Sequence, residues 1–331
     1  MTIESRAYAR AGLLGNPSDG YFGKIIAVAV KNFYASVSLR ESKELNIEPC
    51  SLGTGVYKNI RELVVNIELY GYYSGIRLVK AAIKKFFDHC QDQSIQLEDK
   101  NFSIRYESNI PRQLGLGGSS AIITAVIRAL MEFYKVDIPH EVLPSLILEA
   151  ESKELGINAG LMDRVVQVYG GCVYMDLNQQ VIEEKGYGIY ERLDPKLLPD
   201  LYLAYKPTLG KVSGQVLDDI RMGYERGDKL VLDTLKRLAE IAETGKKALL
   251  QGNFEQFRDL MNENFNLRSR IMKISEGNFE LVRAARDCGA SAKFAGSGGS
   301  IIGMYSGERM YARLRTRLEK LGAEVVKPKI E

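Results

Sequence analysis

A glycine-rich segment at residues 111–121, with the sequence PRQLGLGGSSA, contains the residue types that could hold a polyanion. Gly115, Gly117 and Gly118 lack the Cβ atoms that would keep a bulky anion away from the backbone. Ser119 and Ser120 follow where a helix should begin, so their hydroxyls could cap that helix or reach a metal ion. The first turn of a helix attracts phosphate through its unpaired N–H groups and its dipole. We therefore expect a nucleotide-phosphate site here; the alternative is a tight turn before a buried helix.

The spacing of these residues separates the loop from two other nucleotide-binding motifs. The loop contains no Gly-Lys-Ser or Gly-Lys-Thr sequence, so it is not a Walker-type loop. Its glycines are also not spaced as in the dinucleotide fingerprint, and this argues against an NAD-dependent oxidoreductase.

Two carboxylates are candidates for chemistry beside the loop. Glu151 and Asp163 are twelve residues apart, and the segment 156–160 begins and ends in glycine, which would let the chain fold back between them. Magnesium prefers hard oxygen ligands, usually one or two carboxylates together with substrate phosphates. Phosphoryl transfer to a hydroxyl also benefits from a carboxylate that accepts or orients the hydroxyl proton. The alternatives are that Glu151 lies on a solvated helix face and that Asp163 is a structural partner of Arg164.

Polar residues near the N-terminus could bind a substrate. Arg10 lies in an expected strand and could stabilise a carboxylate or a transferred phosphoryl group. Asn16 and Asp19 follow in the loop GNPSD and could hydrogen-bond sugar hydroxyls. The alternative is an Asx-type turn with a surface arginine.

A second glycine-rich turn lies near the C-terminus. Residues 293–300 read KFAGSGGS, and Gly296 and Gly298 could form another wall against the phosphates or the acceptor. The alternative is an ordinary hairpin turn.

The hydrophobic pattern predicts elements that would bring these residues together. We expect strands at 7–14, 24–39 (one or two), 102–106, 171–176, 201–205, 291–294, 301–305 and 323–326. We expect helices at 75–90, from 119 onward, at 139–155 and 161–168, over most of 214–288, and at 307–321, with 181–193 irregular and of strand potential. This is the pattern of an α+β protein with two domains, residues 1–178 and 179–331. A cleft between two domains is a common place for a ligand.

Composition excludes several classes of partner. The chain has 331 residues with 45% apolar content and a formal net charge of only +3, and it contains no basic tract, so we do not expect a nucleic-acid partner. Four cysteines, at positions 50, 90, 172 and 288, are too scattered for a zinc site and suggest buried thiols. Neither an apolar signal core nor an apolar run of membrane-spanning length is evident, so we expect no membrane partner and a cytoplasmic protein.

In their order and spacing, these segments resemble the GHMP kinase superfamily of small-molecule kinases. The stretches that carry the resemblance are RAGLLGNPSD (10–19), PRQLGLGGSSAI (111–122), AGLMDRVVQVYGGCVYMD (159–176) and KFAGSGG (293–299). The resemblance implies a GHMP fold, with an N-terminal α/β domain that has a left-handed-crossover-type sheet and a ferredoxin-like C-terminal α/β domain. It also implies ATP and Mg²⁺ as the cofactors.

The resemblance assigns roles to individual residues. The loop glycines 115, 117 and 118 and the two serines would hold the phosphates. Ser120, with Ser119 as the alternative, would hold magnesium together with Glu151. Asp163 would be the catalytic aspartate, and Arg10 would lie near the transferred phosphoryl group.

Within the superfamily, the motifs are most similar to those of the glucuronokinases, which implies phosphorylation of the anomeric hydroxyl of D-glucuronate. A sugar acid needs a cationic partner, and Arg164, Lys211 and Arg112 are the candidates. Asn16 stands where galactokinases carry a glutamate, which argues against galactose. A kinase of a heptose or a neutral hexose, and a catalytically silent sugar or nucleotide sensor, remain alternatives. Tyrosines at 70, 72 and 73 could stack on adenine, although core packing is the other reading.

Overall fold

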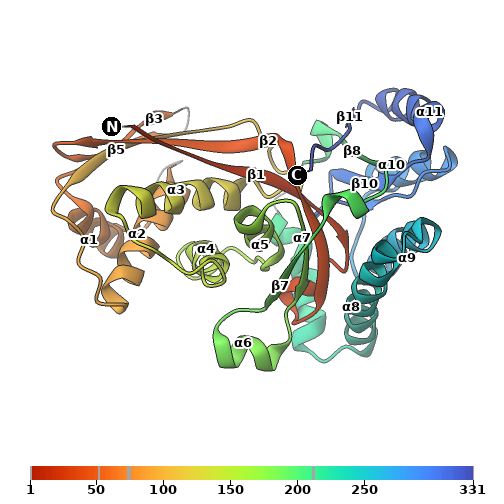
Figure 1. Cartoon of the computed structure of the whole chain (residues 1–331), viewed down its shortest axis with the longest axis horizontal. Helices are drawn as coiled ribbons and strands as arrows, with labels where there is room; N and C mark the ends of the chain where they lie inside the picture. The colour runs from red at the N-terminus through yellow and green to blue at the C-terminus, as the bar shows by residue number, and fades with distance from the viewer. Residues whose placement is uncertain (1, 51–52, 73–75, 211–212, 331) are drawn as a thin grey trace.

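The computed structural model describes residues 2–50, 53–72, 76–210 and 213–330. It contains two β-sheets with helices packed against them, and the second sheet with its helices lies at one end of the molecule (Figure 1). The predicted α+β class is therefore confirmed. A search of the described helices finds none whose length and hydropathy would suit it to a lipid bilayer.

Two long antiparallel strands, β1 (Thr2–Leu14) and β2 (Lys24–Ser42), run through most of the molecule (Figure 1). They pair from Thr2 opposite Arg40 to Leu14 opposite Ile26, with irregularities between Tyr8 and Ala9 and before Leu14. Most of their buried side chains are alanine, valine and isoleucine. Valine and isoleucine suit a pleated strand, and the small alanines leave room for close packing against the sheet. The region 24–39, expected as one or two strands, is a single strand.

The two halves of β2 pair with different partners. Its C-terminal half lies beside β5 (Asn101–Ser108), and its N-terminal half lies beside β6 (Cys172–Asp176). The seven-stranded sheet therefore has the order β4-β3-β5-β2-β6-β7, with β1 also paired to β2. The remaining strands are β3 (Leu45–Cys50), which lies between β4 (Gly53–Tyr57) and β5, and β7 (Ile189–Leu193), which follows β6.

Helices of the first part of the chain lie together along this sheet (Figure 1). They are α1 (Ile60–Tyr70), α2 (Arg77–Asp92), α3 (Gly118–Tyr134), α4 (Leu143–Ser152) and α5 (Met162–Tyr169), with α6 (Gln179–Lys185) between β6 and β7. The helix α3 is apolar on most of its surface and packs directly on β1 and β2, so its first turn is fixed relative to both strands.

The second sheet is antiparallel, with the order β11-β8-β10-β9. Its strands are β8 (Leu201–Tyr205), β9 (Lys293–Phe294), β10 (Ser300–Met304) and β11 (Glu324–Val326). The helices of this part are α7 (Ser213–Glu225), α8 (Lys229–Leu250), α9 (Phe254–Ile271), α10 (Glu276–Asp287) and α11 (Gly307–Glu319). Short 3₁₀ turns occur at η1 (Ser18–Gly20), η2 (Pro195–Leu197) and η3 (Pro207–Leu209).

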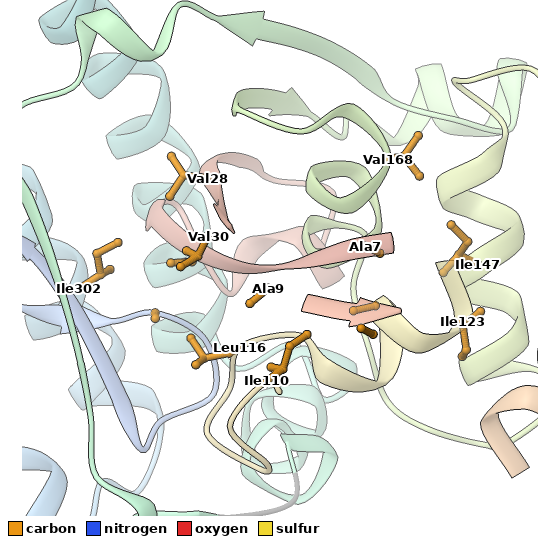
Figure 2. Close-up of a cluster of buried hydrophobic side chains, with 14 of the residues drawn as sticks. Ala7, Ala9, Val28, Val30, Ile110, Leu116, Ile123, Ile147, Val168 and Ile302 are labelled. Atoms are coloured by element: carbon orange, nitrogen blue, oxygen red, sulfur yellow. The ribbon is translucent and has the colours of Figure 1, made fainter. Parts of the chain in front are cut away.

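A continuous apolar core joins the two sheets. Side chains of β1 and β2, of α3 to α5 and of β10 belong to one buried cluster, of which Figure 2 shows a part, with Ala9, Ile123 and Ile302 among its members. The helices α8 and α9 also contact β1 directly. Packed side chains therefore join the two sheets.

The pairing of strands also bears on the predicted boundary between two domains, residues 1–178 and 179–331. Strand β7 pairs with β6, Leu193 lying opposite Cys172, so the first sheet continues beyond residue 178. A boundary that follows the sheets would lie between β7 and β8. The division itself stays a prediction.

The sequence pattern missed some elements. It gave no indication of β3, β4 or α1, and the helix α6 replaces part of the segment expected to be irregular with strand potential. The strand expected over 291–294 is only two residues long. The missed strands and α6 are short, so their apolar periodicity spans too few residues to separate helix from strand. The helix α1 is different: its buried Ile60, Leu63, Val64 and Ile67 follow helical spacing, a signal that the sequence analysis overlooked.

Gly303 in β10 tests the packing of the second sheet. A Cβ at this position would overlap the backbone carbonyl of Ser291, which cannot move without disturbing the sheet. We expect Gly303→Ala to lower the free energy of unfolding by about 1–3 kcal/mol, the usual result of overpacking. Gly20→Ala is the control, because nothing lies within 4 Å of its added Cβ. Urea unfolding that shows equal stability for the two variants would contradict this packing.

Candidate active site

A cavity of about 810 Å³ lies where β1, the loop before α3, the start of α5 and the turn after β9 meet. Its wall includes most of the residues that the sequence singled out. They are Arg10, Asn16, Asp19, Arg112, Gly115, Gly117, Gly118, Ser119, Glu151, Asp163, Arg164 and Gly296. The structure therefore brings together side chains from four separate segments of the chain.

The glycine loop has a backbone that other residues would strain. Gly115 and Gly117 adopt φ values of +64° and +73°, in the left-handed region. A Cβ on Gly117 would lie 3.2 Å from an oxygen of Asp163. Gly117 is also the N-cap of α3, and no side chain caps that helix. The amides of the first turn therefore have no side-chain cap, and their binding of phosphate stays a prediction.

The second glycine turn packs against the first. A Cβ on Gly296 would overlap the carbonyl of Gly115, so the two loops touch through their backbones. Strand β1 contacts both turns, because Arg10 N donates to Leu116 O at 3.1 Å and Gly12 N donates to Ala295 O at 2.7 Å. Gly296 is therefore a glycine because the loops meet closely there, besides lining the cavity.

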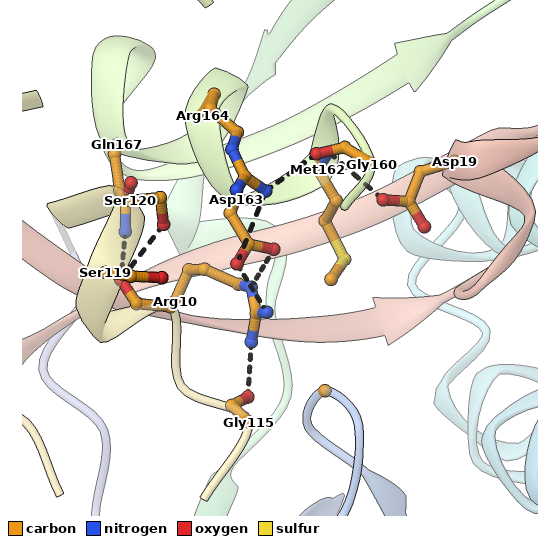
Figure 3. Close-up of polar contacts among 12 residues, drawn as sticks. Arg10, Asp19, Gly115, Ser119, Ser120, Gly160, Met162, Asp163, Arg164 and Gln167 are labelled. Carbon is orange, nitrogen blue, oxygen red and sulfur yellow. Dashed lines mark hydrogen bonds and ion pairs between the residues drawn. The ribbon is translucent and has the colours of Figure 1, made fainter. Parts of the chain in front are cut away.

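Arg10 and Asp163 form a bidentate ion pair at the centre of the site (Figure 3). Arg10 Nε and Nη2 donate to the two oxygens of Asp163 at 2.6 and 2.7 Å. The third nitrogen of the guanidinium, Nη1, donates to the carbonyl of Gly115. A carboxylate has about four lone-pair positions, so Asp163 can still accept a hydrogen bond from a substrate hydroxyl.

Beside this pair, Ser119 and Glu151 place two oxygens together. Ser119 Oγ donates to Glu151 Oε1 at 2.6 Å, and the other oxygen of Glu151 forms an ion pair with Arg164. Arg164 is 3% exposed, and burial followed by the charge of Arg10 lowers its pKa to about 9. Its Nη1 donates to the carbonyl of Gly160 at 2.8 Å. Arg164 is thus engaged inside the protein, which weakens its candidacy as the partner of a substrate carboxylate.

Ser120 lies differently from the expectation. Its side chain is fully buried, and its hydroxyl donates to the carbonyl of Gly117 at 3.1 Å, so it is absent from the cavity wall. The amide of Gln167 donates to the same carbonyl at 2.8 Å (Figure 3). The geometry therefore favours Ser119, the alternative named from the sequence, as the hydroxyl beside Glu151.

The loop after β1 is held by residues of the second sheet and its helices. Asn16 is 2% exposed, and its Oδ1 accepts a hydrogen bond from Lys293 Nζ at 2.5 Å. Asn264 accepts from Gly15 N at 2.7 Å and donates to Asn16 O at 3.1 Å. These hydrogen bonds hold the loop in place, so Asn16 has a structural role in addition to lining the cavity.

Asp19 accepts a hydrogen bond from Met162 N at 3.3 Å (Figure 3). Burial, with a further contribution from the negative charge of Asp163, raises the pKa of the Asp19 carboxyl. The Asp19 carboxylate occupies the space that a Cβ on residue 160 would need, so only glycine fits at Gly160. The loop of Asp19 and the start of α5 therefore fit closely against each other.

The remaining predicted residues lie away from this wall or outside the described chain. Gly298 lines a small separate hollow next to Asn278. Lys211 and Tyr73 lie outside the described residues. Tyr72 donates to Glu154 Oε2 at 2.6 Å, and neither it nor Tyr70 is in the cavity wall, so the structure gives no support to stacking on adenine.

Two buried cations escaped the sequence analysis as site residues. Arg268 on α9 lies in the cavity wall, and Lys293 holds Asn16. The available signal was weak: Asn264 and Arg268, four residues apart, interrupt the apolar stripe of a helix. Polar residues at that spacing share one face, and on a buried face each needs a partner.

Comparison with known proteins gives two family matches and close relatives. The profile described as "GHMP kinases N terminal domain" matches residues 77–171, and that described as "GHMP kinases C terminal" matches residues 246–320. "Probable glucuronokinase 2" from Arabidopsis thaliana is 44% identical over 91% of this chain and 83% of its own length. "Glucuronokinase 1" from the same plant is 43% identical over 91% of this chain and 84% of its own length.

A solved structure shares the fold across the whole chain. The Lin0012 protein from Listeria innocua superposes with a TM-score of 0.83 at 18% identity, covering 100% of this chain and 98% of that one. At this identity the match concerns the fold. The GHMP fold expected from the motifs is confirmed by these family and structural matches together.

The raised pKa of Asp19 gives a test by pH. A carboxyl whose pKa is higher in the folded state binds more protons there, so wild-type stability falls as pH rises through that pKa. Asp19→Asn removes this pH-dependent loss of stability, because asparagine carries no ionisable proton. We expect the variant to match the wild type below about pH 4, the unperturbed range of aspartate, and to become relatively more stable toward neutral pH.

Urea unfolding at several pH values measures this difference. Asp233→Asn, at an exposed position on α8, is the control for replacing an aspartate with asparagine. A stability difference between Asp19→Asn and the wild type that stays constant with pH would contradict the prediction.

Proposed function

The chain belongs to the GHMP kinases, and we propose that it transfers the terminal phosphoryl group of ATP to the anomeric hydroxyl of D-glucuronate, giving D-glucuronate 1-phosphate. The observation that carries this proposal is the convergence of Asp163, held by Arg10, with the uncapped start of α3 in one cavity. The relatives named glucuronokinases, similar over most of their length, support the choice of acceptor.

Asp163 is the proposed proton acceptor for the attacking hydroxyl. Its two oxygens each accept a hydrogen bond from Arg10, which fixes their direction. The free lone pairs can accept or orient the hydroxyl proton in the transition state. Because Arg10 also holds the carbonyl of Gly115, the proton acceptor and the phosphate loop are positioned by one side chain.

The phosphates would lie against the first turn of α3. Its amides and the helix dipole favour negative charge, and they act without a lysine in the loop. The side-chain oxygens of Ser119 and Glu151 suit a Mg²⁺ ion, which usually takes one or two carboxylates and completes its shell with phosphates and water. When bound, the ion would neutralise charge on the phosphates. Among the described residues there is no cluster of three or more carboxylate, histidine or cysteine ligands, so the nucleotide would supply the other ligands.

The acceptor would lie at the opposite end of the cavity, near Asn16, Asp19 and Gly296. A kinase of a heptose or a neutral hexose is the second candidate, because polar groups at this end could equally serve neutral hydroxyls. A silent sensor is disfavoured, since binding alone does not require a carboxylate oriented as Asp163 is.

A coupled assay of ADP release tests the proposal directly. We expect wild-type protein to consume ATP with glucuronate at a higher kcat/KM than with galacturonate, glucose, galactose or a heptose. Omitting magnesium should abolish turnover. Preferred turnover of a neutral sugar would refute the choice of acceptor, and no turnover with any sugar would favour the sensor.

Asp163→Asn tests the proposed mechanism. The amide keeps the size of the side chain but is a much weaker base, so we expect kcat to fall by about 10²–10⁴-fold, the usual contribution of a positioned proton acceptor. The affinity for ATP, measured by calorimetry, should change little. Asp233→Asn should keep wild-type kcat, and near-normal turnover of Asp163→Asn would rule out the assignment.

A further inference from the structure

Arg268 is a buried cation in the cavity wall to which the transfer chemistry above assigns no role. It lies on α9, its side chain has no exposed surface, and it is one of the residues that line the cavity. Its Nη1 donates to the carbonyl of Gly296 at 2.8 Å, and its Nη2 contacts only the sulfur of Met272 at 3.6 Å. Its Nε has no hydrogen-bond partner. A guanidinium offers five N–H donors, so most of its donor capacity is unused.

The charge of Arg268 has no bonded carboxylate: the guanidinium lies over the Phe294 ring, with Cζ 5.4 Å from the ring centroid, and Asp19 acts on its charge without a hydrogen bond. None of its bonds within the described chain goes to a carboxylate. Its neighbour Lys293 is equally buried, and its Nζ donates only to the neutral oxygens of Gly12, Asn16 and Phe294. Burial, with repulsion from Arg268 and Arg10, holds the pKa of Lys293 well below its usual range. Unpaired buried cations are destabilising, and a bound anion would offset that cost.

The other cations in the wall are less suited to an acceptor carboxylate. Arg10 is committed to Asp163, and Arg164 is committed to Glu151. Arg77, Arg105 and Arg112 also line the cavity, but all three are exposed, where an ion pair contributes little. Arg268 combines complete burial with free donors, the setting in which one charged contact discriminates most strongly.

Its position fits the acceptor end. Arg268 holds Gly296, whose added Cβ would meet Arg10 Nη1, so it lines the cavity beside the turn that faces the Arg10–Asp163 pair. One turn earlier on the same helix, Asn264 holds the loop of Asn16. The helix α9 thus presents two polar side chains beneath the proposed sugar site.

We infer that Arg268 selects an acceptor with a carboxylate, by donating hydrogen bonds to the C6 carboxylate of the sugar acid. This inference rests on the proposed function, and it adds the residue that would separate glucuronate from glucose. The two sugars differ only at C6, where glucose has a neutral CH₂OH group.

The test compares these two sugars in Arg268→Gln. A charge-assisted hydrogen bond is worth about 1.5–3 kcal/mol, so we expect kcat/KM for glucuronate to fall by about 10- to 100-fold, chiefly through KM. The kcat/KM for glucose and the KM for ATP should stay within about twofold of wild type, because neither substrate carries the carboxylate that the arginine binds. An unchanged ratio of glucuronate to glucose activity would overturn the inference.

Arg286→Gln is the control for losing a partly buried cation away from the cavity. Arg286 also has an Nε without a partner and bonds only neutral oxygens, but it does not line the cavity. It should lower stability without changing the ratio of the two activities. An equal change of ratio in both variants would assign the effect to folding and refute a direct contact.

If the glutamine variant does not fold, Arg268→Lys is compared on the same two sugars instead. Lysine keeps the charge but loses the planar fork of donors, so we expect the preference for glucuronate to fall by a smaller factor than in the glutamine variant. A preference equal to that of wild type would again overturn the inference.

The acceptor preference of the wild-type protein distinguishes failure of this inference from failure of the proposed function. If another sugar acid is the preferred acceptor of the wild type, the choice of glucuronate fails. The same variants are then compared on that acid and its neutral counterpart, and the inference stands or falls on their ratio. If the wild type prefers neutral sugars, both ideas fail.

Discussion

The ion pair between Arg10 and Asp163 is the interaction on which the arrangement of the site depends. It joins β1 to α5, which are 153 positions apart in sequence, and the same guanidinium also holds the loop before α3. Both partners are largely buried, so removing either one would leave an uncompensated charge, a loss of about 3–5 kcal/mol in comparable cases. The carboxylate proposed to handle the proton and the loop proposed to hold the phosphates are therefore fixed relative to each other.

The two-stranded β1–β2 unit provides the platform for that pair. Its apolar side chains belong to the core beneath α3 as well as the core that reaches β10 and α8 (Figure 2). Backbone bonds from β1 run to both glycine turns. The first and second sheets are thus connected through β1, and the backbones of Gly115 and Gly296 are in close contact where the two glycine turns meet. Gly115 and Gly296 therefore allow the two turns to pack against each other, and they also line the cavity.

The charges around the cavity divide into two kinds. Arg10 and Arg164 are paired with Asp163 and Glu151, so they orient the acids proposed to act on the proton and the metal. Arg268 and Lys293 bond only uncharged groups. Of these two, Arg268 gives the proposed acceptor end a positive charge without a bonded carboxylate, whereas burial and the neighbouring cations hold the pKa of Lys293 well below its usual range. A protein of nearly zero net charge has in this way a local preference for an anion.

The sequence by itself determined the parts whose signal is local. Glycines at positions of positive φ, serines at the start of α3 and apolar periodicity marked the loop, the helices around it and most strands of both sheets. It also placed Glu151, Asp163 and Arg10 as candidates, because those residue types suit phosphoryl transfer. Tertiary structure decided which partners they have. Only packing turned Ser119 rather than Ser120 toward Glu151, committed Arg164 to that carboxylate and brought Arg268 under the cavity. Such choices depend on distances between residues far apart in the chain, which no spacing along the sequence encodes.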